Sequence, residues 1–241
     1  MTDRTDAPLA DDGRTWRELA VARSLDTARS RAESRVQRFM DAALELVNSG
    51  SGKDFTVQDV VARSGQSLRS FYQYFDGKHE LLLALFEESV ASTVVYLAEL
   101  VAEEQDPLQR LHRFVVEYHE LCRPSPDNAG RPGAMAVMAE FAFQLLTEHP
   151  KEASRAFSAL VVMFKELLEA AAAAGAVRSD LRPDRTAGVV LEAVMFNAFS
   201  STIGGWSPQS DGLAAAEDLW SLVFYGIGDA GGSQSPPVSS R

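Results

Sequence analysis

The chain has 241 residues, of which 46% are hydrophobic, and a formal net charge of −11. That length and apolar content are enough for one large domain or two smaller ones, each with a buried core. The single cysteine, Cys122, excludes an intramolecular disulfide and a cysteine-based zinc site, and it fits a reducing cytoplasm.

The sequence predicts neither a secretion signal nor a membrane span, so we expect a cytoplasmic protein that does not bind membranes. Residues 1–13 are polar and acidic and contain no apolar run. The most apolar stretch, Ala187 to Phe199, is interrupted by Glu192 and Asn197 and is shorter than the ~20 residues that a bilayer requires.

Charge is spread unevenly along the chain. Residues 13–80 carry 11 Lys and Arg against 9 Asp and Glu, whereas residues 81–241 carry 11 against 21. Because binding to a polyanion requires cations near the contact rather than a basic chain overall, the first region is compatible with a nucleic-acid partner.

Apolar residues recur every three or four positions along nearly the whole chain, which predicts an all-α fold of about nine helices. Residues 14–35 have a helical pattern and carry six arginines. They form either a solvated helix of mixed charge or an arm that places cations on nucleic-acid phosphates or in the minor groove. The next helix contains Val36, Phe39, Met40, Ala43 and Val47.

Two short helices follow, at about 56–64 and 67–75, with Ser64 and Gly65 between them. A helix, a glycine-containing turn and a second helix form a helix-turn-helix pattern. Further helices are predicted at about 76–104, 107–122, 134–148, 151–174, 183–203 and 211–225, with a loop at 123–133.

The second short helix carries the side chains that we expect to contact DNA. Phe71 and Phe75, four residues apart, would anchor this helix inward. On the opposite side, an arginine can bond guanine, a glutamine can pair with adenine, and hydroxyls and an ammonium group suit phosphates. Leu68 would meet a thymine methyl, although Leu68 and Tyr72 could instead belong to the core. The predicted DNA contacts are Thr56, Ser67, Leu68, Arg69, Ser70, Tyr72, Gln73, Tyr74 and Lys78.

These residues resemble the tetracycline-repressor (TetR) family of bacterial regulators. The resemblance covers Arg35 to Phe86 and rests on the pairs Thr56-Val57 and Ser64-Gly65 and on the stretches FYQYF and GKHEL, residues 71–75 and 77–81. It implies an N-terminal three-helix domain that binds double-stranded DNA. Within that domain it implies base contacts by Leu68 and Arg69, backbone contacts at the helix N-termini of Thr56 and Lys78, and phosphate or groove-edge contacts by Ser67, Ser70, Tyr72 and Tyr74.

The sequence departs from the family's pattern at three places. Gln66 stands where the turn usually has valine, and Tyr74 stands where histidine is usual. Arg69 and Ser70 replace a common Gly-Thr pair. The operator sequence therefore cannot be inferred from relatives.

The C-terminal helices predict a homodimer, as the resemblance also implies. The helix at 183–203 is apolar nearly all round and must be covered on more than one side. Its small residues allow another chain to approach, and the helix at 211–225 offers further apolar side chains. We expect a two-fold four-helix interface that holds two reading helices about 34–36 Å apart on a near-palindromic operator.

Methionines and phenylalanines of the C-terminal region form either ordinary core or a flexible apolar pocket for a small lipophilic effector. Few charged residues share their helix faces, which argues against a strongly charged ligand. The predicted ligand contacts are Met138, Phe141, Phe164, Met195 and Phe199.

Three functions follow. The first is a sequence-specific transcriptional regulator, a repressor by the family's common mode, that an effector releases from DNA. The second is such a regulator gated by a protein. The third, an α-helical enzyme, lacks support because the sequence has no Glu-x-x-His pair on facing helices, no Gly-x-Ser-x-Gly and no phosphate-binding glycine loop. We therefore predict no catalytic residue, metal or cofactor.

The predicted organisation has four parts. An N-terminal arm occupies residues 1–30 and a helix-turn-helix domain residues 31–80. An effector-binding and dimerisation domain occupies residues 81–226, and a disordered tail rich in Gly, Ser and Pro residues 227–241.

Overall fold

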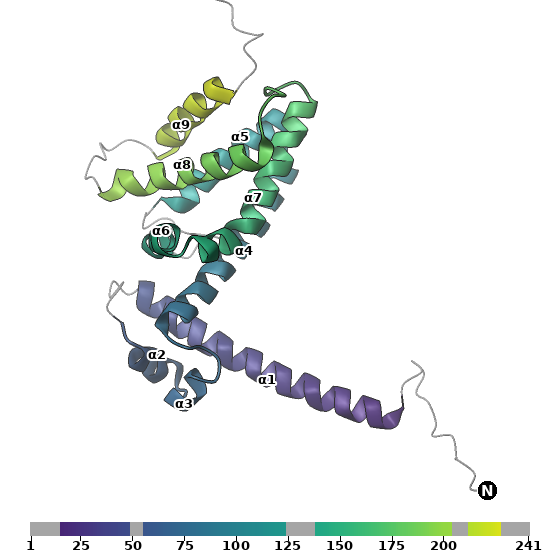
Figure 1. Cartoon of the computed structure of the whole chain (residues 1–241), viewed down its shortest axis with the longest axis vertical. Coiled ribbons are helices and arrows are strands. Elements are labelled where there is room, and N and C mark those ends of the chain that lie inside the picture. The colour runs from purple at the N-terminus through teal and green to yellow at the C-terminus, as the bar shows by residue number, and fades with distance from the viewer. Residues whose placement is uncertain (1–14, 49–54, 124–137, 204–211, 228–241) are drawn as a thin grey trace, which may run out of the picture. The chain divides into compact units, whose positions relative to one another are not determined.

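The computed structural model describes residues 15–48, 55–123, 138–203 and 212–227, and these residues form nine helices and no β-strand (Figure 1). The predicted all-α class is confirmed. The predicted loop at 123–133 and the predicted tail at 227–241 lie almost wholly outside the described residues. By their internal contacts the residues divide into two units, 1–81 and 82–241.

Helix α1 runs from Trp16 to Leu46 and joins two segments that the sequence analysis separated at Val36. Thr15 caps it, because its hydroxyl accepts a hydrogen bond from the N–H of Glu18 while the Glu18 carboxylate accepts one from the N–H of Thr15. Helices α2 and α3 lie beside its C-terminal part, and its N-terminal part continues beyond them (Figure 1). The buried residues of α1 all lie near its C-terminus and are Phe39, Met40, Ala42, Ala43 and Leu46.

Helix α2, Val57–Ser64, ends at a tight turn that requires glycine. Gly65 has a φ of 65°, in the left-handed region where a Cβ atom is disfavoured. An ion pair of 3.1 Å between Arg63 and Glu45 joins α2 to α1. The predicted glycine-containing turn of the helix-turn-helix is present.

Helix α3 is shorter than predicted. Its regular part covers Leu68–Phe71, whereas the sequence pattern predicted a helix to Phe75. The chain tightens into turns after Phe71 because the N–H groups of Tyr74 and Phe75 both donate to the Phe71 carbonyl, at 3.0 Å each. Phe71 and Phe75 nevertheless both lie on the side that faces Phe39 of α1.

Three phenylalanine rings hold α3 against α1. Phe71 is fully buried, and its ring lies edge-on to Phe39 with centroids 5.4 Å apart. The ring centroid of Phe75 lies 5.5 Å from that of Phe71 and 6.3 Å from that of Phe39. Edge-to-face aromatic packing adds attraction to the burial of apolar area. The predicted inward anchoring of α3 is therefore confirmed.

The second unit is a helical bundle whose core runs along α5. Helix α8 packs against α5 and α7, α5 also packs against α7 and α9, and α6 packs against α7. The boundary between the two units falls within α4. The helices are α4 (Lys78–Ala102), α5 (Pro107–Cys122), α6 (Ala139–Glu148), α7 (Pro150–Ala173), α8 (Pro183–Ile203) and α9 (Gly212–Ile227).

Two histidines of α5 link it to its neighbours through polar contacts. His119 Nε2 lies 3.2 Å from the Asn197 side-chain oxygen on α8, and His112 Nε2 lies 2.8 Å from the Glu217 carboxylate on α9. Burial lowers the pKa of His119, so its ring is neutral at pH 7 and adds no charge to the core.

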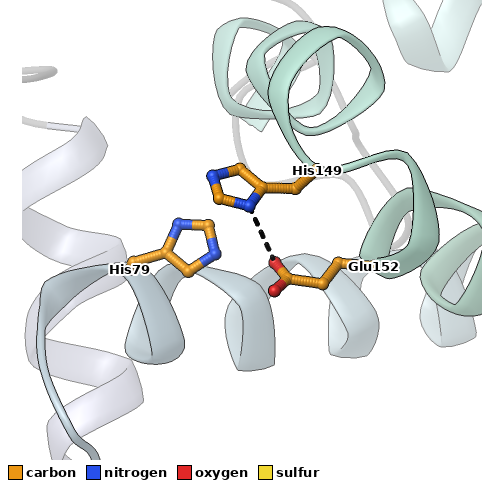
Figure 2. Close-up of side chains that lie close together, drawn as sticks. All are labelled: His79, His149 and Glu152. Atoms are coloured by element: carbon orange, nitrogen blue, oxygen red, sulfur yellow. Dashed lines mark ion pairs between the residues drawn. The ribbon is translucent and has the colours of Figure 1, made fainter.

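The start of α7 carries a third histidine contact. His149 precedes the helix, and its Nδ1 lies 4.0 Å from a carboxylate oxygen of Glu152 (Figure 2). Glu152 lies in the first turn of α7, where a negative charge suits the positive end of the helix dipole.

Within the described ranges, one helix is long and apolar enough to cross a membrane by length and composition alone. That helix is α4, with a mean hydropathy of 1.6 over its most apolar window, of which 39% is buried. The prediction that Ala187 to Phe199 is the most apolar stretch is therefore wrong, because α4 is the more apolar helix. Core helices of water-soluble proteins pass the same test, so the finding is weak evidence for a membrane span.

Candidate functional site

Helix α3 presents a polar and aromatic surface. Its N-cap is Ser67, whose Oγ accepts a hydrogen bond of 3.1 Å from the N–H of Ser70. Arg69 and Gln73 are exposed, Tyr72 is 56% exposed, and Leu68 is 42% exposed. These side chains are open to solvent, so a partner can reach them.

Two of the residues predicted to contact DNA are placed differently. The Ser70 hydroxyl is buried and has no hydrogen-bond partner within the described part of the chain. It therefore does not face the exposed surface with Arg69. Tyr74 is only half-exposed. Tyr74 lies in the turns that follow the end of α3 at Phe71, where the sequence pattern predicted continued helix.

Thr56 and Lys78 occupy helix N-termini, as predicted, and both already have structural partners. The Thr56 hydroxyl accepts from the N–H of Asp59 at 3.3 Å and donates to its carboxylate at 2.7 Å. The hydrogen bond from the Thr56 N–H is the main cause that lowers the pKa of Asp59. Lys78 Nζ lies 4.1 Å from the ring centroid of Phe55, a cation–π contact that sequence reasoning missed.

A cleft of about 480 Å³ opens in the second unit. Among the described residues that line it, Glu192 is the one charged residue, and none is Lys, Arg or His. Tyr118 also lines it, and burial raises the pKa of its hydroxyl, as the neighbouring Cys122 also does, so it is neutral at pH 7. The cleft is lined by Tyr118, Leu146, Pro150, Ala153, Ser154, Phe157, Ser158, Val161, Val162, Gly188, Leu191, Glu192 and Met195.

Of the five predicted ligand contacts, Met195 lines this cleft and the other four do not. Met138, Phe141 and Phe164 are buried elsewhere, the last with its ring centroid 5.0 Å from that of Phe114. The ring of Phe199 stacks on that of Phe143, with centroids 6.5 Å apart. Sequence reasoning also missed the main wall of the cleft, on α7. The available signal was the recurrence of paired positions along that helix, namely 153–154, 157–158 and 161–162.

Apolar side chains are also exposed on α6, α8 and α9. Phe143 is 43% exposed, Val189 60% and Phe196 54%, and all three line a groove of about 450 Å³. On α9, Leu222 is 72% exposed and Tyr225 85% exposed. Exposed large apolar residues are typical of a protein interface. We call these five residues the outer face.

Comparison with protein-family models matches residues 39–85 to the N-terminal domain of "Bacterial regulatory proteins, tetR family". The match covers the phenylalanine cluster, the Gly65 turn and all of α3. Residues 39–85 of this chain are therefore similar to the N-terminal domain of TetR-family regulatory proteins. Comparison with curated proteins finds no match to the sequence.

Solved structures of bacterial transcriptional regulators share the fold. FadR of Thermus thermophilus, a TetR-family transcriptional repressor in complex with lauroyl-CoA, has a TM-score of 0.62 at 19% identity, over 85% of this chain and 100% of that one. FadR of Bacillus subtilis, in complex with stearoyl-CoA, has a TM-score of 0.63 at 16% identity, over 79% and 98%. The ketosteroid regulator KstR2 of Mycobacterium tuberculosis has a TM-score of 0.51 at 16% identity, over 81% and 95%.

Proposed function

We propose that this chain is a homodimeric repressor of the TetR family that binds a near-palindromic DNA operator and leaves it when a small lipophilic ligand binds. The observation that carries the DNA part is the exposed set on α3. Arg69 can bond guanine through two parallel hydrogen bonds, and Gln73 can pair with adenine. The phenylalanine cluster fixes α3, which carries Arg69, and Phe71 and Phe75 flank the turn that carries Gln73, which satisfies the rigidity that base reading needs.

The effector part rests on the cleft of the second unit. Its volume lies within the range of small-molecule sites, and its lining is mostly apolar with a few polar groups from Ser154, Ser158 and Glu192. Two solved relatives of the same fold hold acyl-CoA molecules. With one carboxylate and no cation on its walls, this cleft favours an uncharged lipophile. A regulator gated by a protein would not need the cleft.

Ligand binding would act through α8. Met195 and Leu191 of this helix line the cleft, while Val189 and Phe196 of the same helix belong to the outer face. In a dimer packed through the outer face, a ligand that prefers one position of α8 would shift the spacing of the two reading helices. It can shift that equilibrium only by its difference in affinity for the two states.

The DNA proposal is tested by replacing Arg69. Genomic fragments captured by the purified protein would supply an operator. Arg69→Ala should then lose about 1–3 kcal/mol of discrimination at one base position, because it removes contacts to a base edge. Binding titrations on the operator and on single-base variants of it measure this loss.

Ser70→Ala is the matched control for Arg69→Ala. It lies one residue further along α3 and its hydroxyl is buried, so its removal should leave operator affinity unchanged. An equal loss for Arg69→Ala on operator and random DNA would contradict base reading. Failure of the wild-type protein to bind any DNA would contradict the proposed function itself.

The cleft is tested by thermal unfolding with uncharged C12 alcohols, steroids and lauroyl-CoA as probes. A ligand present at 100 times its Kd should raise Tm by about 5–10 °C. Ser158→Trp should abolish the shift, because its exposed side chain lines the cleft and tryptophan would fill the space. Ala159→Trp, exposed on the same helix and outside the lining, should retain it. No stabilisation by any probe would favour gating by a protein.

A further inference from the structure

The N-terminal part of α1 is an exposed helix outside the family match. That match begins at residue 39, and Phe39 is also the first buried residue of α1. Residues 16–38 extend the helix by roughly 35 Å at 1.5 Å per residue. No side chain in this extension is buried within the described part of the chain. The extension therefore adds nothing to the core of the first unit and is available to a partner.

Arginines dominate the charge of this extension. Residues 16–38 contain six arginines and three acidic residues, in a chain whose net charge is −11. The Arg29 guanidinium pairs with Glu33 at 2.8 Å. The other five are exposed and form no ion pair with a residue that the structure describes, and they are Arg17, Arg23, Arg31, Arg35 and Arg38.

These five arginines share one side of α1. At 3.6 residues per turn they project within an arc of roughly 120°, and the three acidic residues of the extension project outside it. The side chains of all five arginines are exposed. Packing of α2 and α3 on α1 therefore leaves these arginines, which we call the arginine face, open to a partner.

We propose that the arginine face of α1 binds the phosphate backbone of DNA beside the base pairs that α3 reads. The inference rests on the proposed function, because it needs DNA held by α3. The extension is continuous with the part of α1 where Phe39 contacts Phe71 of α3. From Arg17 to Arg38 the face spans roughly 32 Å, close to one turn of the duplex, so several phosphates lie within its reach.

An anionic membrane offers the same phosphate chemistry, and Trp16, Val21 and Leu25 are exposed apolar residues in the extension. DNA is favoured because the extension is one helix with the part that braces the reading helix. Binding of α3 in the groove would therefore also bring the arginines of the same unit close to the duplex. Neutralised phosphates release counterions, so this contact makes affinity steeply dependent on salt.

The test compares the full-length protein with a variant in which all five arginines of the face are changed to glutamine. The plot of log K against log salt for the captured operator should lose about 0.9 of slope for each phosphate contact removed. We expect a loss of about 2–4 in slope and a shorter hydroxyl-radical footprint, with base preference unchanged. Arg29→Gln, on the same helix but outside the arc, should keep the wild-type slope and footprint.

A variant in which the same five arginines are changed to lysine should also retain most of the slope. Circular dichroism, which measures helical content, checks that each variant is folded. If the wild type binds the operator and the glutamine variant keeps its slope and footprint, this inference is overturned while the proposed function stands. If the wild type binds no DNA, the proposed function fails first. If the glutamine changes abolish binding to phosphatidylglycerol vesicles and leave the operator footprint intact, a membrane replaces DNA as the partner.

Discussion

Phe71→Ala should destabilise the first unit by about 3–5 kcal/mol, because the phenyl ring is fully buried and its removal leaves a cavity beside Phe39 and Phe75. Small domains are stable by only about 5–15 kcal/mol in total, so much of the stability of this unit would be lost. Urea denaturation followed by circular dichroism, together with hydrogen exchange of the amides of α1 and α2, measures the effect. Operator binding should be lost with the fold.

The neighbouring aromatic residue provides the control for this change. Tyr72 is 56% exposed and touches Phe71 only edge-on, at 5.5 Å. Tyr72→Ala should therefore cost no more than about 1 kcal/mol of stability and weaken operator binding while the unit stays folded. A Phe71→Ala protein as stable as the Tyr72→Ala protein would show that the phenylalanine cluster does not hold α3 in place.

The double change Phe196→Asp and Leu222→Asp should convert the proposed dimer into monomers. Both side chains are exposed within one subunit, at 54% and 72%, and would be buried against the partner. An aspartate carboxylate without a partner charge is costly to bury in an apolar interface. Sedimentation equilibrium should give half the wild-type mass. Operator affinity should fall by about 10²-fold or more, because the two reading heads are no longer linked.

Val95→Asp is the matched control for the interface. Val95 is 61% exposed on α4 and does not belong to the outer face, so an aspartate there should leave the dimer and its DNA affinity unchanged. Circular dichroism should show that all these proteins are folded. A wild-type protein that sediments as a monomer, or a double variant that remains dimeric, would contradict the proposed interface.

The reading unit could be predicted well from sequence because its signals are local. Gly65 marks a turn that requires a positive φ, and the spacing of Phe71 and Phe75 places two rings on one side. Neither inference requires knowledge of distant residues. The burial of the Ser70 hydroxyl did require it, since it depends on which side chains cover the hydroxyl and not on the local helix pattern.

The cleft could not be predicted from composition. Phe164 and Phe141 are apolar like true cleft residues, yet their rings pack against Phe114 and Phe86 in the core. Which apolar residues fill a core and which line a space depends on the register of helices far apart in the chain. Periodicity identifies the apolar face of a helix, and it does not identify what that face meets.

The lone cysteine has a practical consequence. Cys122 lies at the end of α5 and is buried, and burial raises the pKa of its thiol to about 12. The thiolate is the form that attacks alkylating reagents, so the folded protein should resist alkylation at neutral pH. Each alkylation event would then report a transient opening of the bundle around α5. The single native thiol therefore reports the rate at which the second unit opens, without any labelling mutation.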